Sequence, residues 1–150
     1  MRVKLTLADA SPAETRVRPV PRRGVAVVEF AVVASLLFVL ILGIIEFGRA
    51  MMVLEMLNNA ARNGARIGVL NGSATSDVNS AVTNALAGAG FSGVQTTVQV
   101  NGVTADANTA VSGDAVTVMV KVPYNNVTWL PTSMFLAGKT LGSTVVMRRE

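Results

Sequence analysis

The sequence predicts an α+β protein that has a long N-terminal transmembrane and stalk helix, then a short helix and a small antiparallel sheet. Three observations predict this fold. Residues 25–45 are apolar except for Glu29 and Ser35. Helix-forming residues then continue without proline to residue 69. From residue 94 onward, valines alternate with mostly polar residues, which is the period of a β-strand.

Composition excludes several classes of function. The 150 residues include no cysteine and no histidine, which excludes disulfide scaffolds, Cys/His zinc sites, histidine acid–base catalysis and cysteine nucleophiles. The net charge is +4, but residues 1–23 carry six basic and two acidic side chains, whereas residues 25–150 carry seven of each. The excess charge therefore precedes the apolar segment. We expect no nucleic-acid binding, because that function needs a basic patch on the folded domain.

Four segments follow one another along the chain. We expect residues 1–24 to be a cleavable basic leader and residues 25–45 a transmembrane helix, since 21 helical residues rise about 30 Å, the thickness of a hydrocarbon core. Residues 46–70 would form a helical stalk that continues the membrane helix, and residues 71–150 a small extracytoplasmic α+β domain. Basic residues are concentrated before the span, which places the N-terminus in the cytoplasm.

The stalk is predicted to be an amphipathic helix that ends at Asn71-Gly72. Its predicted apolar face runs through Phe47, Met51, Leu54, Asn58, Ala61 and Ala65, and its polar face through Glu55, Asn59, Arg62 and Arg66.

Two other sets of stalk residues suggest contacts. Glu46 and Arg49 are three residues apart and can pair at the outer membrane boundary. We expect this pair to serve in simple interfacial anchoring, with partner recognition as the alternative. Ala60, Gly64 and Gly68 form a row of small residues that permits close approach, and we expect this row to pack against the chain's own sheet.

The remaining elements are placed by caps, turns and alternation. Residues 76–87 are predicted to form a helix with Ser76 as its N-cap and an apolar stripe made of Val78, Val82, Ala85 and Leu86. Strands are expected at residues 94–100, 103–104, 116–122 and 140–148, with Asn101-Gly102 as a hairpin turn. The loop at residues 125–138 should cover the core with Trp129, Leu130 and Phe135.

An ionisable residue interrupts the apolar segment near its start. Arg22-Arg23-Gly24 precedes the segment, and Glu29 lies five residues after Gly24. A charge within a spanning helix costs a few kcal/mol on insertion scales, so such a residue normally marks a function and has a partner. Together these residues resemble the processing signature of prepilins.

The resemblance continues along the helix. Glu29-Phe30 is followed by the apolar run, then by Glu-Phe-Gly-Arg at residues 46–49 and Ala-Ala-Arg-Asn-Gly-Ala-Arg at residues 60–66. This pattern, over about residues 22–68, closely resembles the TadE-like family, the minor pseudopilins of the tight-adherence (Tad, Flp, type IVb) pilus machinery. The Glu-Phe pair and the sizeable C-terminal domain favour a minor subunit over the main pilin of the filament.

The resemblance implies processing and assembly. A prepilin peptidase would cut between Gly24 and Val25 on the cytoplasmic side, where Arg22 and Arg23 hold the bond at the membrane surface. Glu29 would become the fifth residue of the mature chain. It would be neutralised by the new α-amino group on Val25 of this or a neighbouring subunit, and the pairing would fix the register of packed helices.

The implied partners are the prepilin peptidase, other Tad pilins and minor pseudopilins, the inner-membrane pilus assembly platform and membrane lipid. The chain would cross the bacterial inner membrane once, with its domain in the periplasm. Inside the membrane, Ala31 and Ser35 form a small-residue pair that could face another pilin helix.

No arrangement of nucleophile, base and acid is visible in the sequence, and Asp77, Asp106 and Asp114 are too scattered for a calcium loop. We therefore expect no enzymatic activity, no cofactor and no metal. The alternative function is an uncleaved, signal-anchored extracytoplasmic domain that binds a ligand or an adhesin partner.

Overall fold

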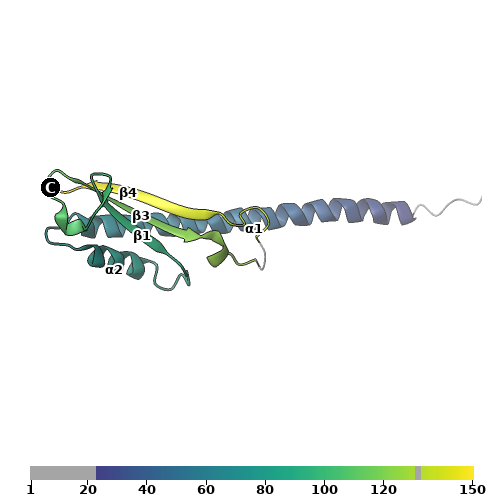
Figure 1. The fold of residues 1–150 in the computed structure, drawn as a ribbon. Helices are drawn as coiled ribbons and strands as arrows, with labels where there is room; N and C mark the ends of the chain where they lie inside the picture. Colours follow the sequence, from purple (N-terminus) through teal and green to yellow (C-terminus); the bar gives the residue numbers. More distant parts are fainter. Residues whose placement is uncertain (1–22, 131–132) are drawn as a thin grey trace, which may run out of the picture. The chain divides into compact units, whose positions relative to one another are not determined.

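The computed structural model describes residues 23–130 and 133–150. The chain divides into two compact units, Met1–Leu36 and Leu37–Glu150. The predicted α+β class is confirmed, because two helices, α1 (Arg23–Gly68) and α2 (Thr75–Ala85), accompany a four-stranded antiparallel sheet (Figure 1).

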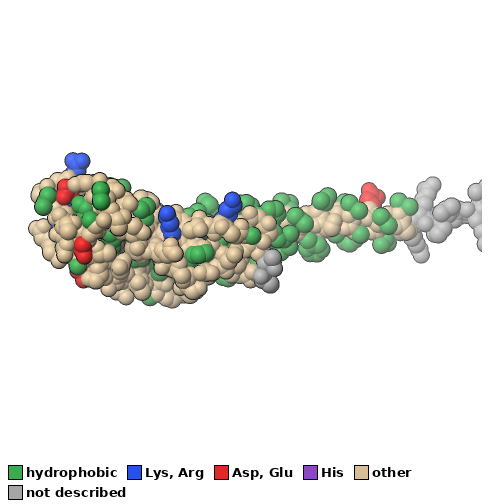
Figure 2. Space-filling model, viewed as in Figure 1, with side chains coloured by type: hydrophobic (Ala, Val, Ile, Leu, Met, Phe, Trp, Pro, Cys, Tyr) green, Lys and Arg blue, Asp and Glu red, His purple; other side chains and the backbone are tan. Residues whose placement is uncertain are grey.

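The described part of the first unit is the beginning of α1. Its residues 24–36 are exposed except for Ala34, which is half-buried. By length and composition α1 can cross a membrane. Figure 2 shows hydrophobic side chains along the surface of this helix. The expected apolar segment is thus helical and turns apolar side chains outward.

The sheet of the second unit has the strand order β2-β1-β3-β4, and every pair is antiparallel. Its strands are β1 (Gln95–Val100), β2 (Val103–Thr104), β3 (Ala115–Pro123) and β4 (Thr140–Arg148). The four predicted strands are confirmed within one residue at each end. In β3, every second residue from Val116 to Val122 is fully buried, so the alternation seen in the sequence faces one side of the sheet.

The hairpin between β1 and β2 has the predicted turn. Val100 pairs with Val103, which leaves Asn101 and Gly102 as the two turn residues. Both have positive φ, 51° and 83°, as a type I′ turn requires. Gly102 supplies this conformation without strain, and Asn101 is among the residues that tolerate it.

From Leu37 onward, α1 belongs to the unit that contains the sheet. The predicted apolar face of the stalk is wrong at its start, because Phe47 and Met51 are exposed. The packed face instead combines Val53 and Leu57 with alanine and glycine residues, which let the helix approach closely packed neighbours. Apart from Glu46 and Arg49, the buried residues of this helix are Ala50, Val53, Leu57, Ala60, Ala61, Gly64, Ala65 and Gly68.

The row of small residues packs within the domain, as predicted. A Cβ atom at Gly64 would lie 2.8 Å from Cγ2 of Val82 in α2 and 3.3 Å from Cγ1 of Val118 in β3. A Cβ atom at Gly68 would lie 3.1 Å from Cγ1 of Val116. Both glycines therefore set how closely α1 approaches α2 and the sheet.

The second helix begins one residue earlier than predicted, and Ala74 rather than Ser76 is its N-cap. Alanine has no side-chain acceptor, so two carboxylates supply the capping instead. Asp77 accepts a 2.9 Å hydrogen bond from the Ala74 N–H, and Asp106 accepts one of 3.0 Å from the Thr75 N–H. Of the predicted stripe, Val78, Val82 and Leu86 are buried, whereas Ala85 is exposed.

Arg149 joins the end of α1 to the loop between β2 and β3. Its side chain is 3% exposed, and its guanidinium donates hydrogen bonds to four backbone carbonyls. The acceptors are Val69, Leu70, Ala107 and Ala110, the second pair lying in and just after the 3-10 turn η1 (Ala107–Thr109). A cation at the C-terminus of a helix also interacts favourably with the helix dipole.

The loop after β3 covers the core with different residues from those predicted. Tyr124 and Val127, in and after the 3-10 turn η2 (Tyr124–Asn126), are buried. Trp129 is 67% exposed and Phe135 is 47% exposed. The prediction that these two aromatic residues cover the core is therefore wrong, because η2 turns Tyr124 inward in their place.

Candidate functional site

The predicted processing segment lies at the beginning of α1. Arg22 lies outside the described residues, and Arg23 is the first residue of the helix. Gly24 and Val25 follow, so the bond between them lies in the first helical turn. The first four N–H groups of a helix have no acceptor within it, so this turn has fewer backbone hydrogen bonds than the interior of α1.

Glu29 lies four residues after Val25, which is about 6 Å along the helix axis. Both residues are exposed, and together with Gly24 and Val28 they line an open hollow on the helix surface. An α-amino group on Val25 would therefore share one helical turn with the Glu29 carboxylate. The same exposure leaves the carboxylate accessible to the amino group of a neighbouring subunit.

Ala31 and Ser35 lie one turn apart on α1, and both are exposed. The Ser35 hydroxyl donates a 2.8 Å hydrogen bond to the backbone carbonyl of Val32. Because this bond satisfies the hydroxyl within its own helix, Ser35 can face lipid or a second helix without an unpaired donor. The pair thus forms a small, accessible strip on the helix.

A second candidate site lies where α1 meets the loop before β4. Glu46 is 1% exposed, and its carboxylate accepts hydrogen bonds from three successive backbone N–H groups. The distances to its nearest oxygen are 3.1 Å from Met134 N, 3.1 Å from Phe135 N and 2.7 Å from Leu136 N. This anion held by consecutive N–H groups fixes the loop on the helix.

The electrostatics of Glu46 follow from these contacts. Burial raises the pKa of its carboxyl, but the hydrogen bonds from Leu136, Phe135 and Met134 favour the charged form and outweigh burial. The net effect is a pKa below the ordinary value of a glutamate. Glu46 is therefore an anion at neutral pH, stabilised by backbone dipoles.

Two more contacts hold the loop after β3 to the same stretch of α1. The Tyr124 hydroxyl donates a 3.0 Å hydrogen bond to the backbone carbonyl of Glu46. The Nε of Arg49 donates one of 2.8 Å to the carbonyl of Val127, and its guanidinium carbon lies 4.3 Å from the ring centroid of Trp129. The same guanidinium carbon lies 5.6 Å from the ring centroid of Phe91. Arg49 is 9% exposed.

The expectation of an interfacial pair between Glu46 and Arg49 is therefore wrong. Each side chain is buried and binds the chain's own loops, which lie about eighty or ninety residues further along the sequence. The three-residue spacing of Glu46 and Arg49 suggests that they pair with each other, because it predicts only contacts within the helix. The loop partners use backbone groups, which leave no signature in side-chain identity, so sequence reasoning missed this site.

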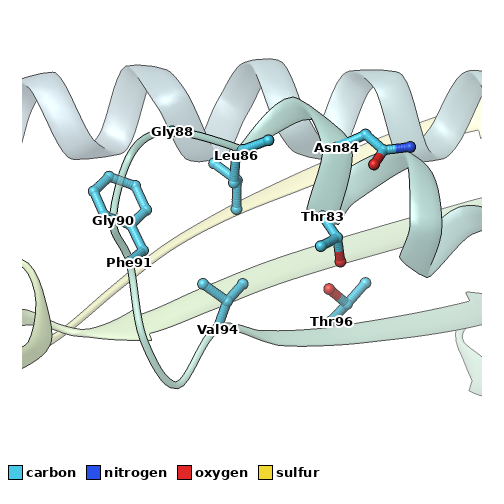
Figure 3. A pocket seen from close by; sticks show the side chains of 9 residues that line it. Thr83, Asn84, Leu86, Gly88, Gly90, Phe91, Val94 and Thr96 are labelled. Carbon is cyan, nitrogen blue, oxygen red and sulfur yellow. The ribbon is translucent and has the colours of Figure 1, made fainter.

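A hollow of about 410 Å³ lies between α2 and β1. Figure 3 shows Thr83 from α2 facing Thr96 from β1, with Phe91 and Val94 at the other end. The lining residues are Thr83, Asn84, Leu86, Ala87, Gly88, Gly90, Phe91, Val94 and Thr96. None of these side chains is ionisable, so the hollow itself offers no acid, base or charged ligand for catalysis.

The aspartates considered for calcium have structural roles. Asp106 accepts from the backbone of Thr75 and Asn108, and these bonds lower the pKa of its carboxyl. Asp114 accepts from the Val111 N–H and the Asn101 side chain, which likewise lowers the pKa of Asp114. Across residues 23–130 and 133–150, no three acidic side chains gather as a metal site would require.

Comparison with known proteins agrees with the resemblance read from the sequence. Residues 24–66 match the family model described as TadE-like protein. Searches of the curated proteins and of the solved structures gave no significant match. The family is one of pilus components rather than enzymes, and the match covers less than a third of the chain. Over residues 24–66, therefore, this chain is similar to TadE-like proteins.

Proposed function

We propose that the chain is a minor pseudopilin of a Tad pilus, anchored in the bacterial inner membrane by residues 25–45 and processed by a prepilin peptidase between Gly24 and Val25. Residues 1–24 are then the leader, and the domain at residues 71–150 lies in the periplasm or enters the fibre. The partners are other Tad pilins and the inner-membrane assembly platform.

One observation carries this proposal. The match to the TadE-like family begins at Gly24, the residue before the proposed cut, and it includes Glu29. Glu29 is an exposed carboxylate on a helix whose neighbouring side chains are apolar and exposed. Within a membrane such a charge needs a partner, and an amino group created by proteolysis supplies one at the matching depth.

The test is processing by a prepilin peptidase. Co-expression of the full chain with such a peptidase should give a membrane-extracted product whose N-terminal residue is Val25. A product that begins at the initiator methionine, or a cut at another bond, would exclude the proposed processing.

Gly24→Leu provides a control for recognition by the peptidase. A Cβ at Gly24 would meet no atom within 4 Å, so the helix itself accommodates a side chain there. Loss of cleavage in this variant would therefore report on the peptidase cleft, in which a glycine lets the backbone approach closely. Thermal unfolding unchanged from that of the native chain would verify that the variant folds.

The alternative, an uncleaved anchored domain that binds a ligand, is favoured by the uncharged hollow between α2 and β1. N-terminal sequencing separates the two functions, because the alternative requires that residues 1–24 persist in cells that contain the peptidase.

A further inference from the structure

An exposed apolar patch lies beside α1 immediately after the proposed membrane segment. We call Phe47, Trp129, Met134 and Phe135 the boundary patch, and all four side chains are exposed. The rings of Phe47 and Phe135 are 6.2 Å apart between centroids. A Cβ at Gly43 would lie 3.2 Å from the ring of Phe135, so the patch reaches back onto the apolar segment itself.

The exposure of the patch is imposed by specific contacts. Glu46 holds the backbone N–H groups of Met134 and Phe135 against α1, and this leaves their side chains outside the core. The guanidinium of Arg49 lies over one face of the Trp129 ring at 4.3 Å, while the residue remains 67% exposed. The structure therefore fixes two aromatic residues and a methionine at the surface beside the end of the apolar segment.

The exposed charged side chains on the strands next to the patch are basic. Residues 115–149 contain no aspartate or glutamate. Lys121 and Lys139 are exposed, and both lie at the end of the sheet that adjoins the patch, since Pro123 pairs with Thr140 there. Basic side chains of this kind suit the anionic phosphates of a bilayer surface.

We propose that the boundary patch inserts into the interfacial layer of the lipid bilayer and seats the extracytoplasmic domain directly on the membrane. This inference rests on the proposed function, because it requires α1 to be the membrane anchor. Tryptophan is enriched at the level of lipid headgroups, and phenylalanine is common on the apolar face of interfacial segments. A patch of one tryptophan, two phenylalanines and a methionine beside the end of a spanning segment therefore meets the headgroup and upper acyl region, with the lysines directed to phosphates.

Lipid contact explains the exposed side chains better than contact with water. Three large apolar side chains fixed outward on one loop would be an aggregation hazard in solution. Seating in lipid removes this apolar surface from water and couples the position of the domain to the depth of α1. The domain would then leave the membrane only when α1 is drawn outward, as entry into a fibre requires.

Trp129 allows a direct test because it is the single tryptophan of the chain. The full chain would be reconstituted in vesicles of phosphatidylcholine and phosphatidylglycerol that carry bromine atoms at chosen depths of the acyl chains. We expect Trp129 to lose most of its fluorescence when the bromines lie close to the headgroups, and less when they lie at the bilayer centre. Aqueous acrylamide should quench it weakly.

A matched control moves the tryptophan to the other end of the domain. The double variant Trp129→Phe with Val103→Trp keeps one tryptophan and an aromatic ring in the patch. Val103 is exposed and follows the turn of the β1–β2 hairpin. Val100, the residue before this turn, pairs with Val116 at the start of β3. Val116 lies about 20 Å along β3 from Pro123, which is at the end of the strand next to the patch. The fluorescence of the tryptophan introduced by Val103→Trp should be insensitive to bromine and fully sensitive to acrylamide.

Extraction with alkaline carbonate separates the two proposals. If the chain stays in the membrane but Trp129 is insensitive to bromine at every depth, the seating of the patch is wrong and the anchor stands. If carbonate releases the chain, both the anchor and the seating are wrong. Protection of Trp129 from bromine and acrylamide alike would mean that protein covers the patch, which would also overturn the lipid contact.

Discussion

The carboxylate of Glu46 accepts a 2.7 Å hydrogen bond from the backbone N–H of Leu136, which lies 90 residues further along the chain. Two neighbouring N–H groups bind the same carboxylate. This side chain therefore determines where the loop before β4 lies on α1. The exposed position of Phe135 depends on this contact, since its own N–H is one of the three donors.

Replacing Glu46 should loosen the loop. In Glu46→Ala, three N–H groups lose their acceptor within a buried site, whereas Glu46→Gln keeps one acceptor oxygen but brings an NH2 donor toward other donors. We expect the melting temperature to fall in the order native, Gln, Ala. Limited proteolysis should cut the loop near residue 134 faster in both variants.

Glu55→Gln is the matched control, because Glu55 is an exposed glutamate on the same helix. It should melt like the native chain. If Glu46→Ala behaves like this control in both assays, the carboxylate does not hold the loop.

The contribution of Glu46 to stability should depend on pH. Its folded pKa lies below its ordinary value, so its stabilising effect is complete above the unfolded pKa and is lost as the pH falls through the folded pKa. The difference in melting temperature between the native chain and Glu46→Gln should therefore be constant from neutral pH to about pH 5 and shrink at lower pH.

Asp106 and Asp114 also have lowered pKa values, but both are present in each protein of this pair, so their effects cancel in the difference. A difference that grows as the pH falls would contradict the proposed ionisation of Glu46.

The elements of the fold could be predicted because their signals are local. The alternating valines of β3, the Asn101-Gly102 turn and the unbroken helix-forming run of α1 each specify their own conformation. The start of the packed face of α1 was harder to predict, because apolar side chains occur on more than one side of the helix there. Phe47 and Met51 were expected on this face and are exposed, whereas Val53 and Leu57 are fully buried.

The junction between α1 and the loops could not be predicted for a different reason. Glu46 binds backbone N–H groups, and every residue but proline has one, so the sequence around Leu136 gives no indication of the contact. The α2 cap shows the same limit, since Asp106 reaches the Thr75 N–H from 31 residues away. The processing and assembly residues, including Glu29, stay predictions that rest on motif and exposure.

Gly64 should resist enlargement. A Cβ there would lie 2.8 Å from Val82 Cγ2, closer than real Cβ contacts allow, so Gly64→Ala should cost about 1–3 kcal/mol of unfolding free energy through overpacking. Gly48→Ala on the same helix is the control. A Cβ at Gly48 meets nothing within 4 Å, so this change should stabilise by about 0.5–1 kcal/mol.

Chemical unfolding of both variants in detergent measures the contrast. The two changes in unfolding free energy are expected to have opposite signs. A neutral Gly64→Ala would mean that α1 and α2 can separate by a few tenths of an ångström without loss of packing.

Arg149 should tolerate no conservative change. Arg149→Lys keeps the charge, but a single ammonium group cannot reach four carbonyls that the planar guanidinium bridges. Leaving buried carbonyls unpaired costs about 1–3 kcal/mol each, so we expect at least about 2 kcal/mol of destabilisation. Arg148→Lys, at the exposed neighbouring residue, should change stability by less than about 0.5 kcal/mol.

Hydrogen exchange at the C-terminal end of α1 gives a second readout for Arg149→Lys. Amides near Leu70 should exchange faster than in the native chain, because the carbonyls of Val69 and Leu70 lose their guanidinium donors. Unchanged exchange there would confine the role of Arg149 to the loop after β2.

Glu29 separates processing from assembly. Glu29→Gln keeps the size of the side chain and removes the charge, and the residue is exposed, so the helix and the domain should fold as before. We expect cleavage between Gly24 and Val25 to continue at the native rate, because the peptidase acts on the preceding turn. Co-purification with other Tad pilins should be lost, since a neutral amide cannot compensate an α-amino charge within the membrane.

Glu55→Gln, outside the apolar segment, is the control and should retain both cleavage and co-purification. Cells that carry Glu29→Gln and still assemble normal pili would show that the carboxylate does not set helix register.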